Sequence, residues 1–215
     1  MATDTLPIVE RQPGGPDFLP PSGGDGPGGW GDHSFRGKSQ RVAMRTYLLG
    51  VWLAMGGITM VFIAFTSALI VRRGVSFDWR PTPFPPVLWL NTAVLVLSSL
   101  TVDTARRALR DGKTGSFRQW WWITTGLGLA FLGGQWMAWK QLSAGGFYLS
   151  TNPSSSFLYL LSGAHGLHLV GGVMAFLVVA LRKRATRVPV EAVSLYWHFM
   201  DGLWIYLLVV LIYWK

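Results

Sequence analysis

The sequence contains no cysteine, and only 13% of its 215 residues are charged. The absence of cysteine excludes disulfides, thiolate metal sites, iron–sulfur clusters, c-type haem attachment and cysteine nucleophiles. A soluble domain carries about 25% charged residues. The low charge, together with 50% hydrophobic residues, therefore predicts a protein whose solvent is lipid.

The first 40 residues lack any long apolar run. They are rich in glycine and proline and have little apolar surface to bury, so we expect residues 1–40 to form a disordered cytoplasmic tail. No apolar core precedes a small-residue cleavage site, which argues against a secretory signal. Residues 41–215 are predicted to form one transmembrane domain.

Five apolar segments occupy that domain. A helix needs about 20 mostly apolar residues to cross a hydrocarbon core about 30 Å thick, and each segment fits with modest fraying or tilt. The segments are continuously apolar and do not alternate, which favours helices over a β-barrel. The sequence predicts an all-α integral membrane protein, a bundle of five transmembrane helices over about residues 47–71, 87–105, 120–139, 157–181 and 192–214.

The basic residues between these segments are unevenly distributed. Thirteen lie in the N-terminal flank and in the second and fourth loops, against five on the opposite side. The positive-inside rule therefore predicts a cytoplasmic N-terminus and an external C-terminus. The net charge of +9 is explained by these loops, so no nucleic-acid partner is expected.

Histidines and carboxylates interrupt the last two segments. His165 and His168 are three residues apart and share a helical face, and Glu191, His198 and Asp201 share a face of the last segment. Polar groups at membrane depth are costly unless they are partnered. A metal site, a proton relay and a hydrogen-bonded network between helices are the alternatives. Helical-bundle metal sites usually repeat a Glu-x-x-His motif, which is absent, so the residues favour a buried polar network without catalytic or metal ligands, and proton transfer stays open.

Glycines are frequent in the same region. In lipid, small residues let helices approach closely, because packing rather than water exclusion drives their association. Helix packing is therefore the predicted role of Gly163, Gly166, Gly171 and Gly172.

Two long motifs carry a resemblance to a known family. SGAHGLHLVGG at 162–172 and EAVSLYWHFMDGLW at 191–204 closely resemble signatures of cytochrome c oxidase subunit III, a core subunit of haem–copper oxidases. LGVWLAM at 49–55 and LNTAVLVLSS at 90–99 are similar to two further helices of that family. Five helices resemble the shorter bacterial form, which lacks the first two of seven.

The resemblance implies a non-redox subunit III of a proton-pumping terminal oxidase in the aerobic respiratory chain, within a bacterial inner membrane. This chain would carry no cofactor; haem and copper would belong to partner subunits. It would stabilise subunit I, support proton uptake and contact subunit II and phospholipids. Alternatives are a similar accessory protein of a quinol oxidase or nitric oxide reductase, or a stand-alone intramembrane metalloenzyme. The family's two usual membrane carboxylates are replaced by Ile58 and Ala138, so their roles do not transfer.

Overall fold

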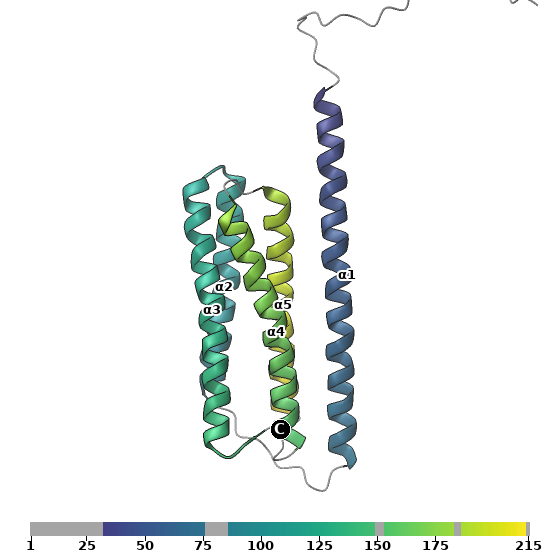
Figure 1. The fold of residues 1–215 in the computed structure, drawn as a ribbon, viewed down its shortest axis with the longest axis vertical. Coiled ribbons are helices and arrows are strands. Elements are labelled where there is room, and N and C mark those ends of the chain that lie inside the picture. Colours follow the sequence, from purple (N-terminus) through teal and green to yellow (C-terminus); the bar gives the residue numbers. More distant parts are fainter. Residues whose placement is uncertain (1–31, 76–85, 149–152, 183–185, 214–215) are drawn as a thin grey trace, which may run out of the picture. The chain divides into compact units, whose positions relative to one another are not determined.

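The computed structural model describes residues 32–75, 86–148, 153–182 and 186–213 (Figure 1). These residues form five α-helices and no strand. The helices are α1 (Asp32–Val75), α2 (Val87–Arg110), α3 (Thr114–Ala144), α4 (Pro153–Leu181) and α5 (Arg187–Tyr213). The predicted all-α architecture with five helices is therefore confirmed.

The helices are longer than the apolar segments that predicted them. α2 continues to Arg110, and α3 begins at Thr114 and ends at Ala144, because the helical backbone extends past the apolar stretch into the polar ends. α1 begins at Asp32, inside the predicted tail, whose residues 1–31 lie outside the described part of the chain.

Four of the five described helices are long and apolar enough to cross a membrane: α1 from Arg45 onward, α2, α4 and α5. α3 has 31 residues but does not reach the same hydropathy, since glycine, threonine, glutamine and tryptophan dilute its aliphatic residues. Membrane crossing by α3 stays a prediction, which its position between two spanning helices favours.

Helices α2 to α5 form a four-sided bundle. α2 packs against α3 and α5, and α4 packs against the same two helices. The centre is aromatic: the Trp121 ring lies 4.4 Å from that of Phe176, and Phe176 lies 4.9 Å from Trp197. The Trp121 Nε1–H donates to the Phe176 carbonyl at 3.0 Å, so this buried ring keeps its polar atom partnered.

Tight turns explain the antiparallel pairing of α2 with α3. Gly112 has a φ of 75°, a left-handed conformation that glycine adopts at helix ends without steric cost. The backbone N–H of Lys113 then donates to the Ala108 carbonyl at 2.9 Å. Because the connection has only three residues, α3 runs back antiparallel alongside α2.

α1 contacts the bundle through one narrow face. Met55, Phe62, Thr66 and Leu69 are buried, while large apolar residues elsewhere on the helix are exposed. The Tyr206 hydroxyl of α5 donates to Thr66 Oγ1 at 3.1 Å. The spacing of seven residues between Met55 and Phe62 and again between Phe62 and Leu69 places these side chains on one helical stripe.

Candidate functional site: a polar network between α2 and α5

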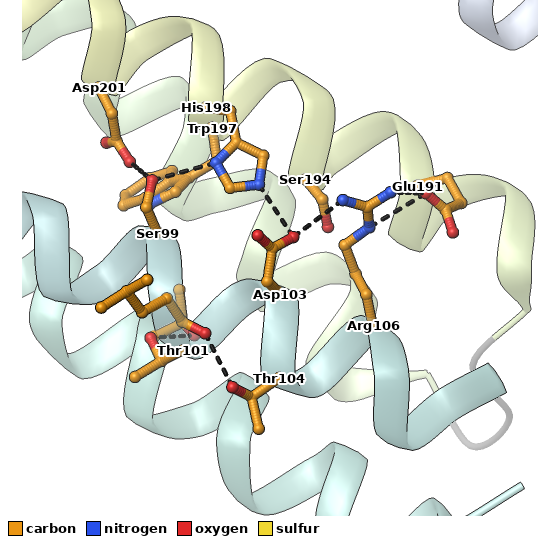
Figure 2. A network of polar contacts seen from close by, with 12 residues as sticks. Ser99, Thr101, Asp103, Thr104, Arg106, Glu191, Ser194, Trp197, His198 and Asp201 are labelled. Atoms are coloured by element: carbon orange, nitrogen blue, oxygen red, sulfur yellow. Dashed lines mark hydrogen bonds and ion pairs between the residues drawn. The ribbon is translucent and has the colours of Figure 1, made fainter. Parts of the chain in front are cut away.

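Two polar stripes face each other across the α2–α5 contact (Figure 2). A spacing of three or four residues keeps side chains on one helical face, and both stripes follow it. Seven side chains form hydrogen bonds between the two helices: Ser99, Asp103, Arg106 and Arg110 of α2, and Glu191, His198 and Asp201 of α5. The contacts continue from the arginine-rich end of α2 to the middle of α5.

The arginine-rich end is a network of charges. Arg106 Nε donates to Glu191 Oε2 at 3.1 Å, and Arg110 Nη2 donates to Glu191 Oε1 at 3.0 Å. Arg106 Nη1 also donates to Asp103 Oδ1 at 3.0 Å. Two guanidinium groups therefore balance two carboxylates. Because these groups are partly exposed, each pair adds less than about 1 kcal/mol of stability, and their main effect is to fix the register of α2 against α5.

His198 occupies the centre of the network. Its Nε2 lies 3.2 Å from Asp103 Oδ1, and its Nδ1 lies 3.0 Å from Ser99 Oγ. The Ser99 hydroxyl also contacts Asp201 Oδ2. Figure 2 shows His198 between Asp103 on one side and Ser99 on the other. One imidazole thus joins an acid at the outer end to an acid at the inner end.

Asp201 is the innermost group of the network. Its residue is 6% exposed, and Oδ2 is held by Ser99 while Oδ1 has no hydrogen-bond partner among the described residues. A buried carboxylate oxygen without a partner is costly, because the desolvation of a charge is uncompensated. Asp201 is therefore not fully hydrogen-bonded by the described residues, as a purely structural contact would be.

Two tryptophans anchor the same helix pair on either side of Asp201. The Trp197 Nε1–H donates to Ser98 Oγ at 2.9 Å, and the Trp204 Nε1–H donates to Thr92 Oγ1 at 3.1 Å. Trp197 is fully buried. These bonds hold α5 against α2 independently of the charged groups.

The structure separates the two histidines of α4 from the α5 stripe. His168 Nδ1 lies 2.8 Å from the Ala164 carbonyl, and its ring packs against Phe62 of α1. His165 is fully buried between Phe131 and Trp204, and neither ring nitrogen has a hydrogen-bond partner in the described chain.

The predicted contact of α4 histidines with the α5 stripe is therefore not among the described hydrogen bonds. The reason is geometric: Glu191, His198 and Asp201 lie on the side of α5 that faces α2, whereas α4 packs on another side of α5. Residues of both helices share a face within their own helix, but helix periodicity does not say which neighbour that face meets.

The four glycines proposed for packing differ in their surroundings. A Cβ at Gly172 would lie 3.2 Å from ring atoms of Trp197 and Tyr196, and one at Gly163 would lie 3.8 Å from Trp139. No atom lies within 4 Å of a Cβ built at Gly166 or Gly171. Of these four glycines, Gly172 is therefore the one at which aromatic rings, those of Trp197 and Tyr196, approach the backbone closely.

The α2 members of the network were not predicted as site residues. Arg106 and Arg110 are among the basic residues whose distribution predicts the orientation of the chain. Their spacing with Ser99 and Asp103, at i, i+4, i+7 and i+11, was a usable signal, because it places all four on one face of α2. A charged stripe on a helix that also contains an apolar face predicts a polar partner on a neighbouring helix.

The fold and this network define a class: a multi-helix membrane protein in which polar side chains join neighbouring helices. Among the residues that the structure describes, no group of three or more His, Cys, Asp or Glu is placed to hold a metal ion. The sequence profile of the family described as cytochrome c oxidase subunit III matches residues 30–215. The chain belongs to this family.

Individual relatives agree with the family profile. The cytochrome c oxidase subunit 3 of Synechocystis sp. is 32% identical over 173 residues, which cover 75% of this chain and 73% of the relative. The subunit 3 of Thermostichus vulcanus is 30% identical over 190 residues, covering 84% and 90%. The probable subunit 3 of Mycobacterium tuberculosis is 33% identical over 172 residues, covering 75% and 83%.

Proposed function

We propose that the chain is the non-redox subunit III of a proton-pumping haem–copper terminal oxidase, which stabilises subunit I and supports proton uptake. The family match over residues 30–215 is the observation that carries this proposal. Subunit I would hold the haem–copper centre, and subunit II would deliver electrons. Several polar side chains of α2 and α5 form hydrogen bonds between those two helices, which suits a subunit that supports chemistry located elsewhere.

Location and orientation follow from the helices and the charges. Apolar helices place the chain in a membrane, and we assign it to a bacterial inner membrane because the sequenced relatives named above are bacterial. The excess of basic residues in the N-terminal flank and in the α2–α3 and α4–α5 connections orients the N-terminus toward the cytoplasm. The Arg106–Glu191 end of the network then lies on the side from which a proton pump takes up protons.

Phospholipid is the second partner that we propose. A groove of about 680 Å³ between α1 and the α4–α5 pair is lined by apolar and small residues, including Val51, Ala54, Ala175 and Val193. Tyr47 and Tyr196 also line it, and such amphipathic rings suit the boundary between acyl chains and headgroups. The groove therefore fits the acyl chain of a lipid.

The direct test is purification of the tagged chain from its native membrane. We expect copurification with a haem–copper catalytic subunit, visible in the optical spectrum, and no stoichiometric iron or copper in the chain after dissociation. A dicopper-containing subunit II in the same complex would identify cytochrome c as donor, and its absence would favour a quinol oxidase or nitric oxide reductase. Stoichiometric metal in the separated chain, or oxygen reduction by it alone, would overturn the proposal.

A further inference from the structure

The hydrogen bonds around His198 admit two proton arrangements. Asp103 Oδ1 accepts from Arg106 Nη1 at 3.0 Å and lies 3.2 Å from His198 Nε2, where an Nε2–H would donate to the same oxygen. The state of the other ring nitrogen, Nδ1, then depends on Ser99 and Asp201. A serine hydroxyl has one hydrogen to donate and two lone pairs that accept.

In the first arrangement His198 is an imidazolium. Its Nδ1–H donates to Ser99 Oγ, and the Ser99 hydroxyl donates to the ionised Asp201 Oδ2. In the second arrangement His198 is neutral. Asp201 carries the proton on Oδ2 and donates to Ser99 Oγ, while the Ser99 hydroxyl donates to the bare Nδ1. Both arrangements use the same two contacts, the one at 3.0 Å between His198 Nδ1 and Ser99 Oγ and the one between Ser99 Oγ and Asp201 Oδ2.

We infer that Ser99, His198 and Asp201 form a proton-exchange site, in which one proton passes between His198 and Asp201 through the Ser99 hydroxyl. The Nδ1–H bond breaks as its proton moves to Ser99 Oγ. The original Ser99 Oγ–H bond breaks as that proton moves to Asp201 Oδ2. The imidazolium–carboxylate pair becomes an imidazole and a carboxylic acid, so atoms and charge balance and no redox partner is needed.

The surroundings of the site favour exchange over a fixed ion pair. Asp201 is 6% exposed and Oδ1 has no partner among the described residues, so the neutral acid avoids the cost of a buried, half-solvated charge. On the other side, Asp103 lies within reach of both His198 and Arg106, and a carboxylate at Nε2 stabilises the imidazolium. Each arrangement thus has a stabilising group of its own.

One end of the site reaches the surface of the chain. The side chains of His198 and Asp103 are 33% and 41% exposed, and the ion pairs of Arg106 and Glu191 continue toward the arginine-rich end of α2. The His198–Asp103 pair thus lies at the surface of the bundle, whereas Asp201 lies inside it. The exchange itself depends only on this chain. Its use in proton uptake rests on the proposed function.

The test follows the proton at both ends of the site, in the full chain reconstituted in lipid and labelled with ¹⁵N-histidine. Two signals are required: the His198 Nδ1 resonance, assigned by its loss in His198→Gln, and the infrared C=O band of protonated Asp201, assigned by its loss in Asp201→Asn. We expect the His198 Nδ1 chemical shift to lie between the values for protonated and unprotonated nitrogen. The fraction of protonated Asp201, read from its acid band, should equal the fraction of His198 with unprotonated Nδ1.

Variants of Ser99 decide whether its hydroxyl carries the proton. Ser99→Ala should uncouple the two signals, and Ser99→Thr should keep them coupled. Ser143→Ala, at a half-buried serine whose hydroxyl donates to the Lys140 carbonyl of its own helix, is the matched control. A fully protonated Nδ1 without any Asp201 acid band wherever the chain is folded would show a fixed ion pair and overturn the inference. Unchanged coupling in Ser99→Ala would overturn it too. Neither result depends on copurification with an oxidase, so this test and that of the proposed function fail separately.

Discussion

Gly128 of α3 allows the Trp197 ring of α5 to reach the middle of the bundle. A Cβ at Gly128 would lie 2.7 Å from Cη2 and 3.2 Å from Cζ2 of Trp197, and 3.2 Å from Cγ2 of Val173. Trp197 is fully buried and its Nε1–H is bonded to Ser98 at 2.9 Å, so the ring cannot withdraw without losing that bond. Gly128→Ala should therefore force either strain or a shift of α5 away from α3.

The size of the effect is that of overpacking a filled core, a loss of about 1–3 kcal/mol. Replacing a helical glycine by alanine also brings a gain of about 0.8–1.0 kcal/mol from helix propensity. The matched control Gly126→Ala shares this gain, because it lies in the same helix with nothing within 4 Å of a new Cβ. The difference between the two variants thus isolates the contact with Trp197.

The assay is reversible unfolding of the purified chain in mixed micelles of mild detergent and dodecyl sulfate, monitored by tryptophan fluorescence. Gly128→Ala should be less stable than Gly126→Ala by about 1–3 kcal/mol, and its fluorescence should report a changed environment of a buried indole. Equal stability of the two alanine variants would refute the claim that Gly128 is required by the position of Trp197.

Three further substitutions probe the contacts of α5. Trp197→Phe removes the indole donor to α2 and should cost about 0.6–1.7 kcal/mol, the range for hydrogen bonds between membrane helices, measured in the same unfolding assay. Glu191→Gln removes the partner of two arginines. It should lower the free energy of unfolding by at most about 1 kcal/mol, and this loss should shrink as salt is raised. Asp111→Asn, at an exposed helix end, is the control and should show no such loss. Tyr206→Phe removes the 3.1 Å bond to Thr66 and should increase proteolysis or hydrogen exchange in α1 while leaving α2–α5 protected.

Two positions at which the family resemblance implies carboxylates carry apolar residues in this chain. Ala138 is buried in α3 and Ile58 is partly buried in α1, and neither can exchange a proton. Asp201 is the one Asp or Glu that is buried among the described residues of the chain. Among the described residues, Asp201 is therefore the buried acid on which the proposed support of proton uptake would depend.

The sequence by itself determined that the protein lies in lipid and that it has five helices. Continuous apolar segments between basic loops can bury their backbone polar groups in lipid only as helices, and this reasoning requires no knowledge of neighbours. It also identified His198, Glu191 and Asp201 as unusual, because charged groups at membrane depth need partners. The motifs at 162–172 and 191–204 carried the family resemblance, which the match over residues 30–215 confirmed.

Only the tertiary structure decided which helix supplies those partners. Periodicity places Glu191, His198 and Asp201 on one face of α5, but the rotation of a helix in a bundle is set by packing with its neighbours, here through Trp197 against Gly128 and α2. That rotation turns the polar face toward Ser99 of α2 and leaves the histidines of α4 among aromatic rings. A one-dimensional pattern specifies faces, whereas contacts between faces depend on how all four helices fill the same volume.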